Sequence, residues 1–127
     1  MNKQNDLLKI PESQIDAIQN IVRPLKYSSS SNLFYAGQIP IVAYLLLDGL
    51  VHFTKNGKVV NTFSRGNVIG LKELMNNQPV DVDAQIQPGT KVCFIDRSTV
   101  LNILEQKVPS TLNKVINKLI RIDSTIR

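Results

Sequence analysis

Residues that build metal sites and catalytic nucleophiles are scarce in this sequence. The 127 residues include one cysteine, Cys93, and one histidine, His52. A disulfide framework needs paired cysteines, and a zinc or cupin-type metal site needs several histidine and carboxylate ligands. No Gly-x-Ser-x-Gly elbow, P-loop or His-Glu-x-x-His helix occurs. We therefore expect no enzymatic activity, no metal and no cofactor, with Cys93 as an inert buried thiol and His52 as a structural strand residue.

Long apolar segments are absent as well. The longest apolar run, Ile41 to Leu47, is far shorter than the roughly 20 residues that a helix needs to cross a bilayer. The first residues, MNKQNDLL, lack the apolar core and cleavage site of a secretory signal. We expect a cytoplasmic protein with no membrane partner.

Charge is present in modest excess and is not concentrated. Fifteen lysines and arginines face ten acidic residues, which gives a formal net charge of +5. Basic residues are most frequent near the C-terminus, where they are typical of a solvated helix face. Nucleic acid is therefore an unexpected partner, although an accessory role at nucleic acid through this helix is an open alternative. The residues concerned are Lys107, Lys114, Lys118, Arg121 and Arg127.

The middle of the chain has the pattern of short strands separated by glycine and proline. The dipeptide Asn56-Gly57 predicts a two-residue hairpin, because both positions tolerate positive φ. Many short strands with no long helix between them predict an antiparallel β jelly-roll barrel. The predicted strands are Asn32 to Tyr35, Ala43 to Leu47, Leu50 to Thr54, Lys58 to Phe63, Asp83 to Ile86 and Lys91 to Ile95.

Helical periodicity flanks this barrel on both sides. An apolar stripe between Pro11 and Pro24 predicts an N-terminal helix, and a short helix capped by Asp96 or Ser98 is predicted before a last helix that begins near Pro109. The fold class is thus mainly β with flanking helices. We expect one domain, with a helix and loop over 1–31, the β-roll over 32–96, helices over 97–127, and no DNA-binding domain.

The last helix carries two adjacent apolar flanks. One flank includes Ile116 and Ile120, and the other continues with 4-3 spacing to the final residues. Both flanks could cover one barrel, but the length of the 4-3 stripe favours a parallel helix pair in a homodimer. The predicted dimer interface consists of Leu112, Val115, Leu119, Ile122 and Ile126.

The order of elements resembles the cyclic nucleotide-binding domains of catabolite activators and of cyclic-nucleotide-dependent kinases. Four motifs between about Leu33 and Ile126 carry the resemblance. They are Leu33-Phe34-Tyr35-Ala36-Gly37, Tyr44 to Gly49 with its Tyr-x-Leu-x-x-Gly pattern, Gly66-Asn67-Val68-Ile69-Gly70, and Leu74 in a short helix. The stretch Gly66 to Ala84 has the form of an anion cradle, and the resemblance implies that its part after the second glycine, Gly70, is a phosphate-binding cassette.

The resemblance also implies two ligand-binding side chains that this sequence lacks. In the family, a glutamate directly after the second glycine accepts the ribose hydroxyl, and an arginine near the end of the cassette pairs with the phosphate. Here the first position is Leu71, and the second is Val80, or Asp81 if the spacing differs by one residue. Neither choice is a cation, so binding of a cyclic nucleotide is not expected.

The predicted degenerate pocket consists of Gly70, Leu71, Lys72, Glu73, Leu74, Val80 and Asp81. A shift of one or two residues could bring Glu73 to the ribose position; otherwise Lys72 and Glu73 are solvated surface charges. Leu71 and Val80 could close the pocket themselves or accept a less polar ligand.

These residues predict a degenerate cyclic-nucleotide-binding-like regulatory or scaffold domain. We expect it to act by protein–protein interaction with an unidentified partner in bacterial signalling. The alternatives are a small-ligand sensor with an altered pocket and a nucleic-acid or transcription accessory protein.

Overall fold

The computed structural model describes residues 9–105 and 111–121. In this part of the chain, eight strands form two four-stranded antiparallel sheets, with the strand orders β1-β8-β3-β6 and β2-β7-β4-β5. The prediction of an antiparallel β-roll with flanking helices is confirmed. The strands are β1 Pro24–Lys26, β2 Ser31–Phe34, β3 Val42–Asp48, β4 Val51–Lys55, β5 Lys58–Phe63, β6 Val68–Ile69, β7 Asp83–Ile86 and β8 Lys91–Asp96.

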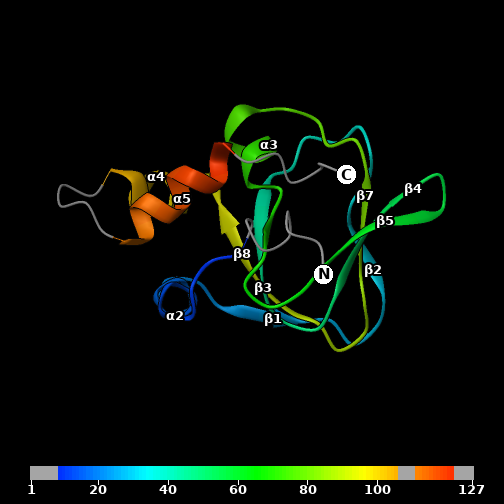
Figure 1. Ribbon diagram of the computed structural model, residues 1–127, viewed down its shortest axis with the longest axis horizontal. Helices are drawn as coiled ribbons and strands as arrows, with labels where there is room; N and C mark the ends of the chain where they lie inside the picture. The colour runs from blue at the N-terminus through cyan, green and yellow to red at the C-terminus, as the bar shows by residue number, and fades with distance from the viewer. Residues whose placement is uncertain (1–8, 106–110, 122–127) are drawn as a thin grey trace.

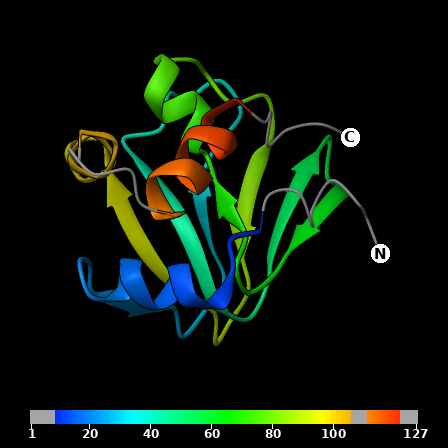
Figure 2. The same ribbon diagram turned by 60° about the vertical axis from the view of Figure 1, so that its left-hand side comes forward.

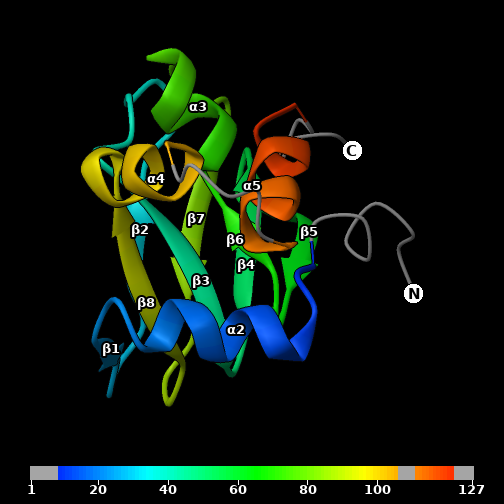
Figure 3. The ribbon, with the colours of Figure 1, turned by 90° about the vertical axis from the view of Figure 1, so that its left-hand side faces the viewer.

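The helices gather on one side of the molecule. Figures 1 and 3 show α2, α4 and α5 over the outer face of the first sheet, whereas the β4–β5 hairpin projects from the opposite side. Helix α5 lies between α3 and α2 (Figure 2) and contacts both of them as well as α4. The helices are α2 Glu12–Gln19, α3 Leu71–Asn76, α4 Arg97–Leu104 and α5 Thr111–Arg121.

Local signals in the sequence place several of these elements. Asn56 and Gly57 have φ values of 53° and 76°, as the hairpin prediction requires. Of the two candidate caps for α4, Asp96 is the one used, because its carboxylate accepts a hydrogen bond of 2.8 Å from the Thr99 amide. That hydrogen bond lowers the pKa of Asp96.

Two strands were not predicted from the sequence. All three residues of β1 are exposed, and β1 pairs by its backbone with Lys91–Cys93 of β8, so no alternation of apolar side chains marks it. Strand β6 has only two residues, both buried, and pairs with β3. Both strands are too short for a period-2 pattern to be visible.

Gly49, between β3 and β4, is required by a close approach to Thr90. Its φ is +87°, and a Cβ added there would lie 2.7 Å from the Thr90 Cα. Thr90 is fully buried and bonds to the amide and carbonyl of Leu50 through its hydroxyl, so it cannot move aside easily.

We expect Gly49→Ala to lower the free energy of unfolding by about 3 kcal/mol, from left-handed strain together with steric overlap. The matched control is Gly57→Ala, with φ +76° and nothing within 4 Å of the added Cβ. The control should cost about 1 kcal/mol, because it adds only the backbone strain. Urea denaturation measures both variants, and equal losses would contradict the proposed overlap with Thr90.

Candidate functional site

The cassette begins at a backbone position that suits glycine. Gly70 has a φ of +79° and precedes α3, which is followed by Asn77 with a φ of 54°. After the helix, residues 77–82 lead into β7. The chain therefore retains the glycine corner, short helix and loop of a phosphate-binding cassette.

Leu71 and Val80 lie in the hydrophobic core, whereas Asp81, the other candidate for the second ligand-binding position, is exposed. Leu71 and Val80 are each 2% exposed, and Leu74 is 3% exposed. Burial of these apolar side chains stabilises the domain by roughly 1.5 to 3 kcal/mol each. The expectation that Leu71 and Val80 could close the pocket themselves agrees with this placement.

Aromatic rings occupy the space beside the cassette glycine. A Cβ added to Gly70 would lie 3.6 Å from the Phe34 ring. The Phe34 ring centroid is 5.8 Å from that of Phe53, which in turn is 4.5 Å from that of Phe63, both in edge-on packing. Phe34, Phe53 and Phe63 are all buried, so this series of rings fills the interior between the sheets.

The backbone at the end of the cassette is also engaged by the protein. The Val80 amide donates to the Gln38 carbonyl oxygen (2.9 Å), and the Val80 carbonyl oxygen accepts from the Gly37 amide (2.7 Å). The Asp83 carboxylate accepts from the Ala36 amide (2.8 Å). Residues 36–38 thus close over residues 80–83, and the Val80 amide is not available to a phosphate.

The charged residues of the predicted pocket have different surroundings. Lys72 is half-buried, whereas Glu73 is 4% exposed, so the description of Glu73 as a solvated surface charge is wrong. Glu73 belongs to the buried side of α3, with Leu71 and Leu74. Asp81 is exposed, and its carboxylate lies 3.9 Å from the Lys55 ammonium group.

Two cations near the cassette were not identified from the sequence. Lys55 comes from the end of β4 and reaches Asp81, which precedes the neighbouring strand β7. The Arg97 guanidinium donates to the Leu74 carbonyl oxygen at 2.5 Å, which connects α3 to the start of α4. This carbonyl lies near the C-terminal end of α3, where a positive charge stabilises a helix. An anion would favour the N-terminal end, so Arg97 is not placed to bind one there.

Helix α5 turns its apolar side chains toward its own domain. Ile116 and Leu119 are buried in the core, and Val115 and Ile120 pack against it. Leu119 is thus buried within a single chain, although its 4-3 spacing assigned it to a dimer interface, and the homodimer stays a prediction. The exposed residues are polar, among them Lys114, Asn117 and Lys118.

The rest of the predicted dimer interface lies outside the described residues. This applies to Ile122 and Ile126, and to the side chain of Leu112. A helix pair formed by these three residues stays a prediction.

The lone cysteine and histidine have structural surroundings. Cys93 is buried in β8, and burial raises the pKa of its thiol, as expected for an inert cysteine. His52 bonds to the Thr62 hydroxyl on the neighbouring strand, with 2.9 Å between Nδ1 and Oγ1.

Within residues 9–105 and 111–121, no group of three or more histidine, cysteine or acidic residues could hold a metal ion. No helix among the described residues has the length and hydropathy needed to cross a membrane.

Comparison with solved structures shows the same fold in several proteins. The catabolite activator protein of Thermus thermophilus superimposes with a TM-score of 0.67 at 18% identity, covering 87% of this chain and 52% of that chain. The regulatory subunit of a cAMP-independent protein kinase A from Trypanosoma brucei gives 0.61 at 18% identity, covering 78% and 38%. This chain thus spans about half, or less, of the length of these two proteins.

A shorter protein matches over its whole length. The cyclic nucleotide-binding-like protein from Brucella abortus gives a TM-score of 0.61 at 21% identity, covering 83% of this chain and all of that chain. The sequence model of the cyclic nucleotide-binding domain matches residues 24–107, about two thirds of the chain and nearly all of the β-roll. With the glycine corner, the short helix α3 and the two facing sheets in place, this chain belongs to the cyclic nucleotide-binding domain family.

Proposed function

We propose that this domain is a degenerate member of its family that acts as a regulatory or scaffold module by protein–protein interaction, in a bacterial-type signalling complex. The observation that carries the proposal is the burial of Leu71 and Val80, each 2% exposed, at the two ligand-binding positions of the cassette. A domain that keeps its framework without these side chains is suited to binding a partner rather than a cyclic nucleotide or a substrate.

The energetic argument concerns the cyclic phosphate and the ribose. Loss of a bidentate contact between guanidinium and phosphate costs on the order of 2 to 5 kcal/mol, and loss of the ribose acceptor adds roughly 1 to 3. Even the lower sum weakens a micromolar ligand by about a hundredfold. Asp81 and Asp83 add negative potential near the same end of the cassette.

One structural relative supports this view. The Trypanosoma brucei protein is the regulatory subunit of a cAMP-independent kinase, and its cAMP-bound structure is that of a mutant with three substitutions, one of them threonine to arginine. Cyclic-nucleotide independence thus occurs in a protein with this fold, and an arginine is among the substitutions in the cAMP-bound form.

Titration calorimetry with cAMP, cGMP and cyclic dinucleotides tests the loss of binding. We expect no saturable heat, because neither a guanidinium nor an open amide is present at Val80. Saturable binding tighter than about 10 µM, near −7 kcal/mol, would refute the proposal.

The interaction role needs a separate measurement. A partner recovered from the native cell must rebind the purified domain with saturable affinity, and an excess of cAMP should leave that affinity unchanged. If cAMP displaces or recruits the partner, the domain is a nucleotide-dependent switch and the proposal is wrong.

A further inference from the structure

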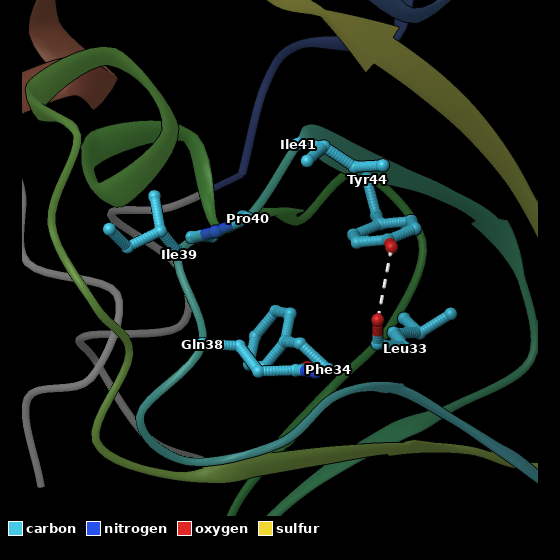
Figure 4. A pocket seen from close by; sticks show the side chains of 7 residues that line it. All are labelled: Leu33, Phe34, Gln38, Ile39, Pro40, Ile41 and Tyr44. Carbon is cyan, nitrogen blue, oxygen red and sulfur yellow. Dashed lines mark hydrogen bonds between the residues drawn. The ribbon is translucent and has the colours of Figure 1, made fainter.

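A concave region lies beside the cassette, next to Gly70. A cavity of about 380 Å³ is bounded by Leu33 and Phe34 of β2, by Tyr44 of β3, and by residues 38–41 of the segment that joins the two strands (Figure 4). Its volume is within the range of small-molecule sites. Leu71 and Val80 do not line it.

The cavity lies beside strands that have a hydrogen-bonded neighbour on one side only. Strand β2 is the edge of its sheet. Strand β1 pairs with β8 only at Lys91–Cys93, so from Phe94 onward β8 has a partner on its β3 side alone. The Phe94 side chain is 37% exposed and packs edge-on against Tyr44, with 5.3 Å between the ring centroids.

The lining carries no charged side chain. Its side-chain polar groups are the Tyr44 hydroxyl and the Gln38 amide. The hydroxyl donates to the Leu33 carbonyl oxygen at 3.2 Å, which orients it and leaves its oxygen as an acceptor (Figure 4). Burial, with a smaller contribution from Tyr27, raises the pKa of Tyr44 to about 12, so the hydroxyl is neutral at physiological pH.

The rim of the cavity is apolar and open to solvent. Ile41 is 84% exposed and Ile39 is 46% exposed, and both line the cavity. A ligand that covers these side chains would gain roughly 25 cal/mol for each Å² of apolar surface removed from water. The rings of Phe34 and Tyr44 offer an aromatic ligand edge-on or offset packing.

We propose that this cavity binds an uncharged, mainly apolar small molecule with an aromatic ring and one hydroxyl or amide donor. The ring lies among Phe34, Tyr44 and the two isoleucines of the rim, and the donor bonds to the Tyr44 hydroxyl oxygen. The cavity adjoins the cassette, because the Gln38 carbonyl oxygen accepts from the Val80 amide and Pro40 lies near Gly70, but neither Leu71 nor Val80 lines it. The proposal does not depend on a partner protein. Phosphates and carboxylates are disfavoured, because no cationic side chain lines the cavity to pair with them.

The probe pair 2-naphthol and 2-naphthoate tests this assignment, because at pH 7 the two differ in charge on the same ring system. NMR titration of the ¹⁵N-labelled chain should show saturable shifts at the amides of Gln38, Ile39, Ile41 and Tyr44 with 2-naphthol. We expect 2-naphthoate to bind at least about tenfold more weakly, since its carboxylate must be desolvated. Equal binding of the two probes, or shifts confined to other residues, would overturn the proposal.

Two exposed positions provide a matched pair of variants. Ile41→Asp places a carboxylate on the rim, whereas Val59→Asp makes the same change on β5, where the side chain is 56% exposed. We expect Ile41→Asp to weaken 2-naphthol binding by about fivefold or more and Val59→Asp to leave it unchanged. If both variants weaken 2-naphthol binding equally, or if neither weakens it, the probe does not occupy this cavity.

Discussion

Replacing Leu119 with aspartate is expected to unfold the domain rather than to dissociate a dimer. Leu119 is 3% exposed and lies on α5, which contacts α2, α3 and α4. The substitution removes a buried side chain and places a carboxylate in the same apolar site. We expect the free energy of unfolding to fall by about 4 kcal/mol or more, a large part of the stability of a domain of this size.

Asn117→Asp provides the control, because it makes the same change of charge two residues away at an exposed position of the same helix. Urea denaturation followed by circular dichroism should show a large loss for Leu119→Asp and a small one for the control. If Leu119→Asp is as stable as the wild type but has half its particle mass in light scattering, Leu119 belongs to a dimer interface and this prediction is wrong.

Reintroducing the family's charges at the cassette is expected to be costly and to yield no nucleotide binding. In the double variant Leu71→Glu, Val80→Arg, both new side chains occupy positions that are 2% exposed. The Phe34 ring lies against Gly70, and residues 37 and 38 hold the Val80 backbone, so the charges would be buried without their ligand. We expect a loss of on the order of 3 to 5 kcal/mol and no saturable binding of cAMP.

The variant Asp81→Arg serves as the comparison, since it places the same guanidinium one residue later in the chain. Asp81 is exposed, so this variant should change stability little, although it loses the exposed pair with Lys55. Calorimetry and thermal denaturation with and without cAMP measure both properties. If cAMP stabilises the double variant, the interior can open and the cassette is only vacant, not closed.

Several features could be predicted from short stretches of sequence. The Asn56-Gly57 hairpin depends on two residues that tolerate positive φ, and the Asp96 cap depends on one carboxylate beside free helix amides. The replaced cassette positions, Leu71 and either Val80 or Asp81, follow from the resemblance to the family through the glycine corner. In each case the determining interaction lies within a few residues along the chain.

Other features required contacts between distant segments. The apolar stripe of the last helix allowed both a dimer seam and packing on its own domain, and periodicity did not show that Leu119 is buried within one chain, because it describes a face without naming what covers it. Strand β1 escaped detection because its three exposed residues are held by β8, almost seventy residues later. Lys55 beside Asp81 and Arg97 beside Leu74 likewise had no signal in the sequence.

By itself, the sequence predicted a β-roll and placed Leu71, and Val80 or Asp81, where the resemblance implies a carboxylate and a guanidinium, because residue identity settles which chemistry is present. Only the tertiary structure decided that Leu71 and Val80 are buried, that α5 covers its own domain with Leu119, and that a neutral cavity opens beside Tyr44. The reason is physical: burial and cavity shape arise from packing among residues far apart in the chain, and local patterns do not encode which surfaces meet.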